Sequence, residues 1–576
     1  MIEKICPKCK IPMMGDTCVK ENCGCRTEAS TTLYWCKECN VPIYEKECPI
    51  CNNQGTYIAT DLRPVFPEER LLVALIMDKE PYAFMNTSMW YGSNAYIVDG
   101  AKVRLSLTTI NKWEIEKVKV LKEKYDEYVS GMDTTYFEDN IQLYIRANAD
   151  RYNYITDEAI RFVQSYQDKY PLEDMMVSFS GGKDSTVTSH LVNRALGTNK
   201  VLHVFGDTTL EFPATMEYKK RFNKNEESQG VRVLTAKNRE KNFEELCEVI
   251  GPPSRVMRWC CTVFKTGAIQ KTIATAFKGK TSILTFYGIR RSESASRSKY
   301  DRESDSPKIT KQTVVSPIID WLDYDVWLYI LTTGIDFNDA YRLGYSRVGC
   351  WCCPNNGAWS EFLSKVHMHE QYVHWHDLLV DFAKKIGKPD AEDYVNDGKW
   401  KARQGGNGLE AAQTSIVSFE PCATDENSFN YDLQKPISEE LYELFKPFGY
   451  INRDLGNKRL GEVYIMDRAG KVVLILQGRI GSTKLKVTIK KKNLAGAKTL
   501  AAAEGKVKCQ ITKYQMCIGC KACESVCKHD AISVKDDGTG TITYKIDDEK
   551  CKRCTECVGH FDAGCYMRKV LCIKRG

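Results

Sequence analysis

The stretch around residue 180 constrains the fold more than any other part of this 576-residue chain. A short apolar run, Met175–Phe179, leads into Ser180-Gly181-Gly182-Lys183-Asp184-Ser185, after which apolar residues recur with helical spacing. This order predicts a strand, a tight loop and the first turn of a helix. Adjacent glycines let backbone N–H groups approach an anion, and the helix dipole favours negative charge there. With Lys183 and the hydroxyls of Ser180 and Ser185, the loop is a predicted phosphate cradle.

Further short apolar segments follow at intervals that helices can fill. Lys200–Asp207, Gly230–Leu234 and Thr281–Tyr287 each predict a strand. Strands that alternate with helices predict an α/β domain built on a doubly wound parallel sheet. Asp207 ends the second strand, and ligands of such sheets bind beyond the carboxyl ends of the strands. We therefore expect Asp207 to face a nucleotide or Mg²⁺.

Three elements of this region resemble one superfamily. Ser180–Ser185 resembles the PP-loop, Ser-Gly-Gly-x-Asp-Ser, of ATP pyrophosphatases and sulfonucleotide reductases. Asp207–Pro213 resembles the Asp-Thr-Gly-x-x-Phe-Pro stretch of phosphoadenylyl-sulfate (PAPS) reductases, with Thr209 in place of the glycine. Gly288–Arg297 is similar to the Gly-x-Arg-x-x-Glu-Ser-x-x-Arg element of PAPS-reductase-like proteins. A basic loop exposed to solvent is the alternative for this last element.

The resemblance implies an adenine nucleotide α-hydrolase-like core that binds ATP or an adenylyl sulfate (APS or PAPS). It assigns Lys183, Asp184 and Asp207 to catalysis, with Mg²⁺ near Asp207 or Asp184. Arginines in the third element would bind phosphate or sulfate through paired hydrogen bonds. The nucleotide-binding set implied by the resemblance is Ser180, Gly181, Gly182, Lys183, Asp184, Ser185, Asp207, Gly288, Arg290, Glu293, Ser294 and Arg297.

The 26 cysteines are the most unusual feature of the composition. Because the N-terminus lacks the apolar core of a signal peptide, Cys-x-x-Cys pairs indicate metal or iron–sulfur ligands rather than disulfides. The first nine predict a tandem zinc ribbon that binds one or two Zn²⁺ ions and either braces the fold or grips RNA or DNA. One four-thiolate site is formed by Cys36, Cys39, Cys48 and Cys51. The other begins with Cys6 and Cys9; the spacing leaves Cys18, Cys23 and Cys25 as candidates for its second half, and we assign Cys23 and Cys25.

A second group of cysteines lies inside the predicted nucleotide-binding domain. Cys260-Cys261 and Cys350-Trp351-Cys352-Cys353 place five thiols in two short segments. Four thiolates in two clustered pairs suit a [4Fe–4S] cluster, with zinc as the alternative. Cluster-bearing APS reductases and DNA-phosphorothioation sulfurtransferases look similar here. We assign Cys260, Cys261, Cys350 and Cys353 as ligands, and Cys352 as a substitute ligand or a free catalytic thiol.

The last cysteines have the spacing of a two-cluster ferredoxin, in which the fourth cysteine of each run binds the other cluster. Lys528 replaces the usual proline after the fourth cysteine, and the final spacer is longer than usual. One predicted [4Fe–4S] set is Cys517, Cys520, Cys523 and Cys565. The other is Cys551, Cys554, Cys557 and Cys527. With the middle group, this makes three predicted clusters.

The chain is too long for one core. We predict a tandem zinc ribbon at 1–60, a small β-rich module and helical linker at 61–150, the PP-loop domain at 151–385, a linker at 386–435, a small basic α+β module at 436–505 and the ferredoxin domain at 506–576. No apolar run approaches about 18 residues, and the net charge of +7 is mild. We expect a cytoplasmic protein with no membrane partner.

Two departures from the sulfonucleotide reductases bear on function. Their Glu-Cys-Gly-x-His tail, which carries a nucleophilic cysteine, is missing, and the PP-loop is intact where theirs tends to be degenerate. Both favour ATP-dependent activation over reduction of PAPS. The resemblance then implies an enzyme that binds ATP, releases pyrophosphate as it adenylates an acceptor, and supports sulfur transfer with electrons from its own ferredoxin domain. The resemblance implies tRNA or DNA as the acceptor, a cysteine desulfurase or another sulfur donor, and an external electron donor.

Two alternatives stand beside this reading. A sulfonucleotide reductase would form sulfite from APS or PAPS, with Cys352 or Cys422 as the substitute nucleophile. A non-catalytic nucleic-acid-binding or redox-sensing protein would carry a vestigial PP-loop, and the complete hexapeptide argues against such decay.

Overall fold

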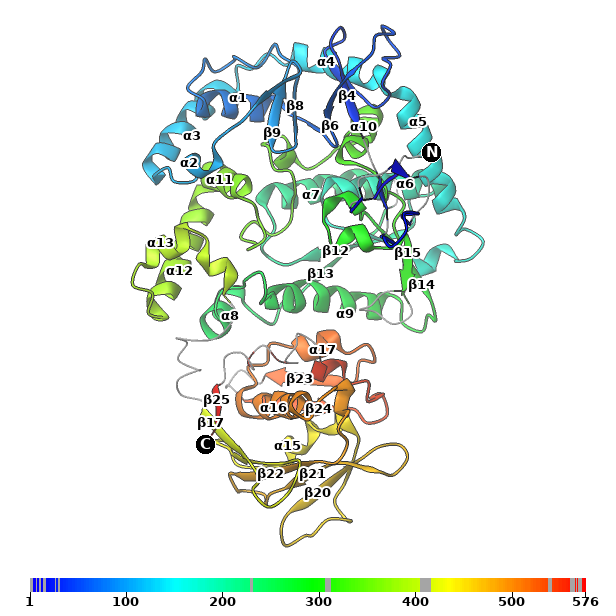
Figure 1. Ribbon diagram of the computed structural model, residues 1–576. Coiled ribbons are helices and arrows are strands. Elements are labelled where there is room, and N and C mark those ends of the chain that lie inside the picture. The colour runs from blue at the N-terminus through cyan, green and yellow to red at the C-terminus, as the bar shows by residue number, and fades with distance from the viewer. Residues whose placement is uncertain are drawn as a thin grey trace.

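The computed structural model places the N-terminal two thirds of the chain in one large body and the C-terminal third beside it (Figure 1). It describes residues 4–6, 8–9, 12–13, 17–25, 27–29, 32–227, 231–305, 312–403, 416–536, 541–559, 565, 567 and 572–575. Among these residues, no helix combines the length and the apolar character needed to cross a membrane.

The centre of the large body is a six-stranded sheet in the order β13-β12-β11-β14-β16-β15. All neighbouring strands are parallel except the edge strand β15, which is antiparallel to β16. The strands are β11 (Met175–Phe179), β12 (Leu202–Asp207), β13 (Val233–Lys237), β14 (Ile283–Tyr287), β15 (Glu303–Asp305) and β16 (Gln312–Val315). The predicted α/β class and parallel sheet are confirmed, with β13 beginning three residues later than predicted.

Alternate residues of β11 bury themselves on opposite faces of this sheet. Met175 and Val177 pack with Val163 and Val192 from two helices on one face, whereas Met176 packs with residues of a third helix on the other. The helices from residue 149 to residue 396 are α5 (Ala149–Gln164), α6 (Lys183–Leu196), α7 (Pro213–Glu227), α8 (Phe243–Ile250), α9 (Gly267–Ala276), α10 (Asp323–Thr333), α11 (Ala358–His367), α12 (His369–Lys385) and α13 (Ala391–Asn396).

The N-terminal region is less β-rich than predicted. Residues 61–70 contain the short strand β7 and the start of helix α1, which has a proline at its first turn, as helices favour. The four-stranded sheet has the order β10-β9-β8-β7. The elements here are β1 (Lys4–Ile5), β2 (Pro12–Met13), β3 (Glu28–Ala29), β4 (Leu33–Cys36), β5 (Val41–Ile43), β6 (Thr56–Ala59), β7 (Arg63–Pro64), α1 (Pro67–Ile76), β8 (Met89–Gly92), β9 (Ala95–Val98), β10 (Ala101–Val103), α2 (Leu107–Ile110), α3 (Ile115–Val129) and α4 (Thr135–Ala147).

The C-terminal third corrects the predicted domain boundaries. The predicted linker 386–435 contains α13 and two strands of a seven-stranded sheet, in the order β19-β20-β21-β22-β18-β17-β25. Its edge strand β25 comes from the end of the chain, which we assigned to the ferredoxin domain. The strands are β17 (Ile416–Pro421), β18 (Ser428–Asp432), β19 (Tyr450–Asn452), β20 (Glu462–Met466), β21 (Val472–Gln477), β22 (Lys484–Ile489) and β25 (Cys572–Arg575).

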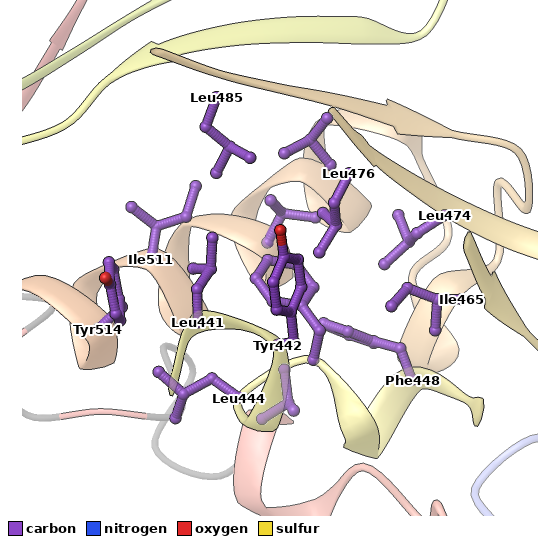
Figure 2. Packing of buried hydrophobic residues seen from close by; sticks show 14 of the residues in the cluster. Leu441, Tyr442, Leu444, Phe448, Ile465, Leu474, Leu476, Leu485, Ile511 and Tyr514 are labelled. Atoms are coloured by element: carbon purple, nitrogen blue, oxygen red, sulfur yellow. The ribbon is translucent and has the colours of Figure 1, made fainter. Parts of the chain in front are cut away.

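One apolar core joins this sheet to the ferredoxin elements. Helix α15 (Glu439–Glu443) supplies Leu441, which lies near Leu485 of the sheet and Ile511 of α16 (Figure 2). The same core reaches Val534 and Val558 of the ferredoxin region. The remaining elements are α16 (Leu500–Met516), α17 (Ala522–Val526), β23 (Ile532–Asp536), β24 (Ile542–Ile546) and α18 (Glu556–Gly559). The α+β module and the ferredoxin region therefore share a core and are not separate units.

Candidate functional site

The PP-loop occupies the switch point of the sheet, where β11 is flanked by β12 and β14. Gly181 has φ +72°, a conformation that favours glycine. Gly288, just after β14, lies against the first turn of α6, since a Cβ there would be 2.6 Å from the carbonyl oxygen of Asp184. Ser185 Oγ donates to the Gly182 carbonyl (2.8 Å) and accepts from the Ser180 N–H (3.1 Å). The loop thus has the close backbone approach and helix N-terminus that suit an anion.

A buried ion-pair network lies directly beside the loop. Lys183 Nζ is 3.0 Å from Asp323 Oδ1, and Arg290 reaches Asp184 Oδ1 (2.5 Å) and Asp323 Oδ1 (2.9 Å). Lys183 is 3% exposed and Arg290 is 4% exposed. The structure therefore corrects the prediction that Arg290 binds phosphate through paired hydrogen bonds, because its guanidinium is engaged by Asp184, Asp323 and the Ser292 hydroxyl.

The network fixes the charge of its members. Burial alone would raise the pKa of Asp184, but Arg290 and Lys183 outweigh it and lower that pKa to about 2. Burial alone would lower the pKa of Lys183, and attraction to Asp184 and Asp323 reverses the effect, so this pKa is raised. Lys183 and Asp184 are consequently ionised and paired at neutral pH.

Asp61 is a member of this site that the sequence did not reveal. It follows the second zinc ribbon, and its carboxylate accepts hydrogen bonds from the backbone N–H groups of Asp323 and Tyr324, both at 3.0 Å. These N–H groups open α10 and would otherwise lack partners. Burial, and then repulsion by Asp323, raise the pKa of Asp61 to about 7. No local pattern marks Asp61, because its partners are some 262 residues away.

Asp207 ends β12 as predicted and is 6% exposed. Its Oδ2 lies 3.2 Å from Lys237 Nζ, whose side chain is 37% exposed. Its Oδ1 accepts from the Thr209 N–H at 2.9 Å. Thr209, which replaces the usual glycine, adopts φ +68°, so the turn keeps a left-handed conformation without glycine. Asp207 is thus held by a partner that solvent can reach.

Residues of the element Gly288–Arg297 form hydrogen bonds and an ion pair with one another, so the element is not an open basic loop. Glu293 accepts from the Arg290 N–H at 3.0 Å and is paired with Arg297. The Arg297 N–H donates to Ser294 Oγ at 3.2 Å. Of the two predicted arginines, Arg297 is the more accessible, with a side chain that is 30% exposed.

The middle cysteines contact Thr208, which follows β12 at the carboxyl ends of the parallel strands. We call this side of the sheet, where the PP-loop lies, the nucleotide edge. Thr208 Oγ1 is 3.4 Å from Cys350 Sγ, and Glu211 forms an antiparallel bridge with Cys350. Cys260 and Cys261 stand at the start of η2 (Cys261–Thr266), a π-helical turn of the kind found often at functional sites. A hydrogen bond with Cys260, and then Arg258, lower the pKa of Cys261 to about 5. The structure brings both segments together, and their thiols form a donor set that suits iron–sulfur ligation.

Cys352 does not have the environment of a nucleophile. It is 6% exposed in an apolar cluster that includes Trp259 and Trp375. Burial raises the pKa of its thiol well above the ordinary value. Since a nucleophilic cysteine must be an accessible thiolate, the structure corrects the predicted catalytic role of Cys352.

The N-terminal thiols form two compact groups, and the first differs from the predicted one. Cys36, Cys39, Cys48 and Cys51 have all their sulfur atoms within 4.8 Å of one another, as predicted. The other group at this spacing is Cys6, Cys9, Cys18 and Cys23. Cys18 therefore takes the place assigned to Cys25, which contacts Cys23 from outside the group. Both donor sets suit Zn²⁺. The second ribbon packs against α4 and α10, so it braces the nucleotide-binding domain.

The ferredoxin cysteines gather in two sets. Cys527, Cys551, Cys554 and Cys557 line one cavity with Ile532 and Ile546. In the other set, Cys523 is an electrostatic neighbour of Cys517, Cys520 and Cys565. Each set contains the four thiols that the sequence groups together, and four thiolates suit an iron–sulfur cluster.

Comparisons with known proteins find two matching domain families in the chain. Residues 174–356 match the phosphoadenosine phosphosulfate reductase domain, and residues 516–560 match the 4Fe-4S dicluster domain. The chain carries a PAPS reductase domain. It also carries a ferredoxin domain with two cluster motifs.

Similar proteins cover only parts of the chain. An uncharacterized protein of Methanocaldococcus jannaschii is 30% identical over 295 residues, which are 51% of this chain and 59% of that protein. Adenosine 5'-phosphosulfate reductase of Neisseria meningitidis is 39% identical over 98 residues, 17% of this chain and 36% of the enzyme. The crystal structure of PAPS reductase from Candida auris is 14% identical and covers 35% of this chain and 96% of its own, with a TM-score of 0.28.

The ferredoxin domain docks on the PAPS reductase domain through α17, which lies below α9 in Figure 1. Gly267 allows the contact, because a Cβ there would be 2.0 Å from Ser525 Oγ. Gln270 Nε2 donates to the Cys527 carbonyl at 3.1 Å. Three ion pairs surround this contact: Lys241–Asp536 (2.8 Å), Lys271–Glu524 (3.1 Å) and Lys521–Glu240.

The docking brings two cysteine sets to one apolar cluster. Cys260 and Cys352 of the middle group, and Cys520 and Cys565 of the first ferredoxin set, all belong to or pack against it. Cys554 of the second ferredoxin set is exposed. The nucleotide edge, the middle thiols and the first ferredoxin set therefore adjoin one another in that order.

Proposed function

We propose that the protein is an iron–sulfur enzyme that binds ATP at the PP-loop, releases pyrophosphate as it adenylates an acceptor, and supports sulfur transfer with electrons from its own ferredoxin domain. The observation that carries this proposal is the direct contact of Thr208 with Cys350 at the nucleotide edge, 3.4 Å apart. An electron or sulfur atom held at the middle thiols would be adjacent to the bound nucleotide.

The charges at the site support a role for Mg²⁺. Lys183 and Arg290 are already paired with carboxylates, so a triphosphate needs additional positive charge. Asp184 is fully engaged, whereas Asp207 is held by the half-exposed Lys237. Asp207 is therefore the better Mg²⁺ ligand of the two residues predicted.

Catalysis in this proposal depends on positioning and charge. The PP-loop backbone and the Ser180 and Ser185 hydroxyls orient the phosphates. Lys183 and Arg290 hold Asp184 and Asp323 in fixed positions. The acceptor is tRNA or DNA, sulfur comes from a cysteine desulfurase or a comparable donor, and an external carrier supplies electrons. So many cysteines assigned as metal-binding thiolates fit a reducing compartment such as the cytoplasm.

A second candidate is a sulfonucleotide reductase that forms sulfite from APS or PAPS. The APS reductase of Neisseria meningitidis, which resembles part of the chain, favours it, and a docked ferredoxin domain would supply the two electrons that the reaction consumes. The burial of Cys352 weighs against it, because this reaction needs a thiolate at the sulfonucleotide.

The test uses full-length protein purified without oxygen. One sample receives ATP and Mg²⁺, with and without tRNA or DNA, and is assayed for pyrophosphate. The other receives APS or PAPS with a low-potential reductant and is assayed for sulfite. We expect pyrophosphate that increases with nucleic acid and falls at least about 100-fold in Lys183→Ala, the scale expected for one lost electrostatic contact. The matched control is Lys200→Ala, an exposed lysine outside the site.

The second sample decides between the candidates. Sulfite formation without pyrophosphate release would overturn the first proposal and support the reductase. Activity in neither sample, with ATP affinity unchanged in Lys183→Ala, would contradict both.

A further inference from the structure

A buried lysine stands between the two ferredoxin ligand sets. Lys513 lies on α16, outside the residues that match the ferredoxin domain, and is 2% exposed. Its ammonium group donates a hydrogen bond to the carbonyl oxygen of Cys557 at 2.7 Å. Cys557 belongs to the second set, so the contact ties α16 directly to those ligands.

The electrostatic neighbours of Lys513 are cysteines of both sets. The strongest attractions come from Cys523, Cys509, Cys557 and Cys565. Cys523 and Cys565 belong to the first set and Cys557 to the second. Among the described residues, no carboxylate forms an ion pair with Lys513. A buried ammonium without a counter-charge costs several kcal/mol, so this position is favourable only when the surrounding sulfur ligands carry negative charge.

Helix α16 holds Lys513 in this position from its other side. Ile511 and Tyr514 of α16 pack into the apolar core of the α+β module (Figure 2). Lys513 shares the opposite face with Cys509, one turn earlier and fully buried. The helix is thus anchored by its apolar side chains and cannot turn Lys513 out to solvent without losing that packing.

We propose that Lys513 is an electrostatic positioning residue for both ferredoxin ligand sets, with its ammonium group favouring the more negative, reduced state of each. One-electron reduction adds one negative charge next to Nζ, and a fixed buried cation stabilises that charge more than solvent-exposed lysines do. The proposal concerns the cluster sites alone and holds for either candidate reaction.

The test is a redox titration of full-length, iron-loaded protein, followed by electron paramagnetic resonance. Signals are assigned with Cys517→Ser for the first set and Cys551→Ser for the second. We expect Lys513→Met to lower the reduced-to-oxidised ratio of both clusters at least tenfold at a fixed potential. This corresponds to a reduction potential that is 59 mV lower for one electron. Lys513→Arg keeps the charge and should retain the wild-type ratio. Lys535→Met, which removes an exposed lysine of β23, is the matched control.

A second variant separates the effect of charge from that of hydrogen bonding. It also tests the proposal if Lys513→Met binds iron poorly. Lys513→Gln keeps a donor for the Cys557 carbonyl but has no charge, so we expect it to lower both potentials. Wild-type potentials in Lys513→Gln would overturn the proposal, as would an equal shift in Lys535→Met.

Discussion

At the scale of single residues, Asp61 shows how a carboxylate can be held by its fold and still be disfavoured in its charged form. Two backbone N–H groups of α10 donate to it, yet burial and Asp323 raise its pKa from 3.8 to about 7. A folded-state pKa above the unfolded value means that the protonated group stabilises the fold. That stabilisation is complete below about pH 4 and is lost as the pH rises through 7.

We predict that Asp61→Asn reduces the loss of stability at rising pH. Between pH 5.5 and 8 the wild type should lose about 2 kcal/mol more unfolding free energy than the variant, because about 1.5 pH units of this interval lie below the shifted pKa. The measurement is urea unfolding followed by tryptophan fluorescence at several pH values. Parallel pH profiles for the two proteins would show that Asp61 is already ionised in the fold.

The first zinc site gives a second prediction for single residues. The grouping of Cys18 with Cys6, Cys9 and Cys23 predicts that Cys18→Ser loses one equivalent of zinc, as a tetrahedral site needs four ligands. Cys25→Ser is the matched control and should keep the wild-type zinc content, measured by elemental analysis. Loss of zinc in Cys25→Ser with retention in Cys18→Ser would restore the ligand set assigned from the sequence.

At the scale of elements, the contact of α17 with α9 decides how the ferredoxin domain is held. We predict that Gly267→Leu separates these helices, because even a Cβ would overlap Ser525. Overpacking of this kind costs about 1–3 kcal/mol. Reduction of the middle cysteine site by the ferredoxin domain, followed by stopped-flow absorbance, should slow at least about tenfold, while the iron content stays unchanged.

The control for this variant lies on the same helix. Ala274→Leu adds the same side chain at an exposed position of α9 and should reduce at the wild-type rate. Equal rates in Gly267→Leu and wild type would mean that electrons reach the middle site without this contact.

Elements with a strong local signal were predictable from the sequence. The strand, loop and helix around Ser180–Ser185 follow from apolar spacing and glycine chemistry, and β12 from a run ending in Asp207. The run Leu71–Ile76 was misread as part of a β-rich module, because a short apolar run does not distinguish a buried strand from a buried helix. Asp61 and Asp323 were missed because their contacts join distant segments.

At the scale of the whole molecule, the chain does not proceed from one domain to the next as the linear division assumed. β25, at residues 572–575, returns to pair with β17 in the sheet that begins at residue 416. The pairing of β25 with β17 could not be predicted from the sequence, because the two strands are far apart in the chain and each is short. The cysteine spacing groups Cys527, Cys551, Cys554 and Cys557 as the structure does, but it does not predict that β25 joins the seven-stranded sheet.

This return predicts a dependence of the first ferredoxin site on a strand that carries none of its ligands. Cys565 lies between α18 and β25 in the sequence, so we expect the β17–β25 pairing, in which Val417 and Ile573 are register partners, to help hold Cys565 in place. Proline lacks a backbone N–H and fixes φ, so Ile573→Pro should weaken the pairing of β25 with β17. We expect a loss of about four iron atoms per chain, one cluster, with zinc unchanged, measured by elemental analysis. Ile573→Val, which keeps the backbone N–H, should retain full iron; equal iron in both variants would mean that Cys565 is held without the strand.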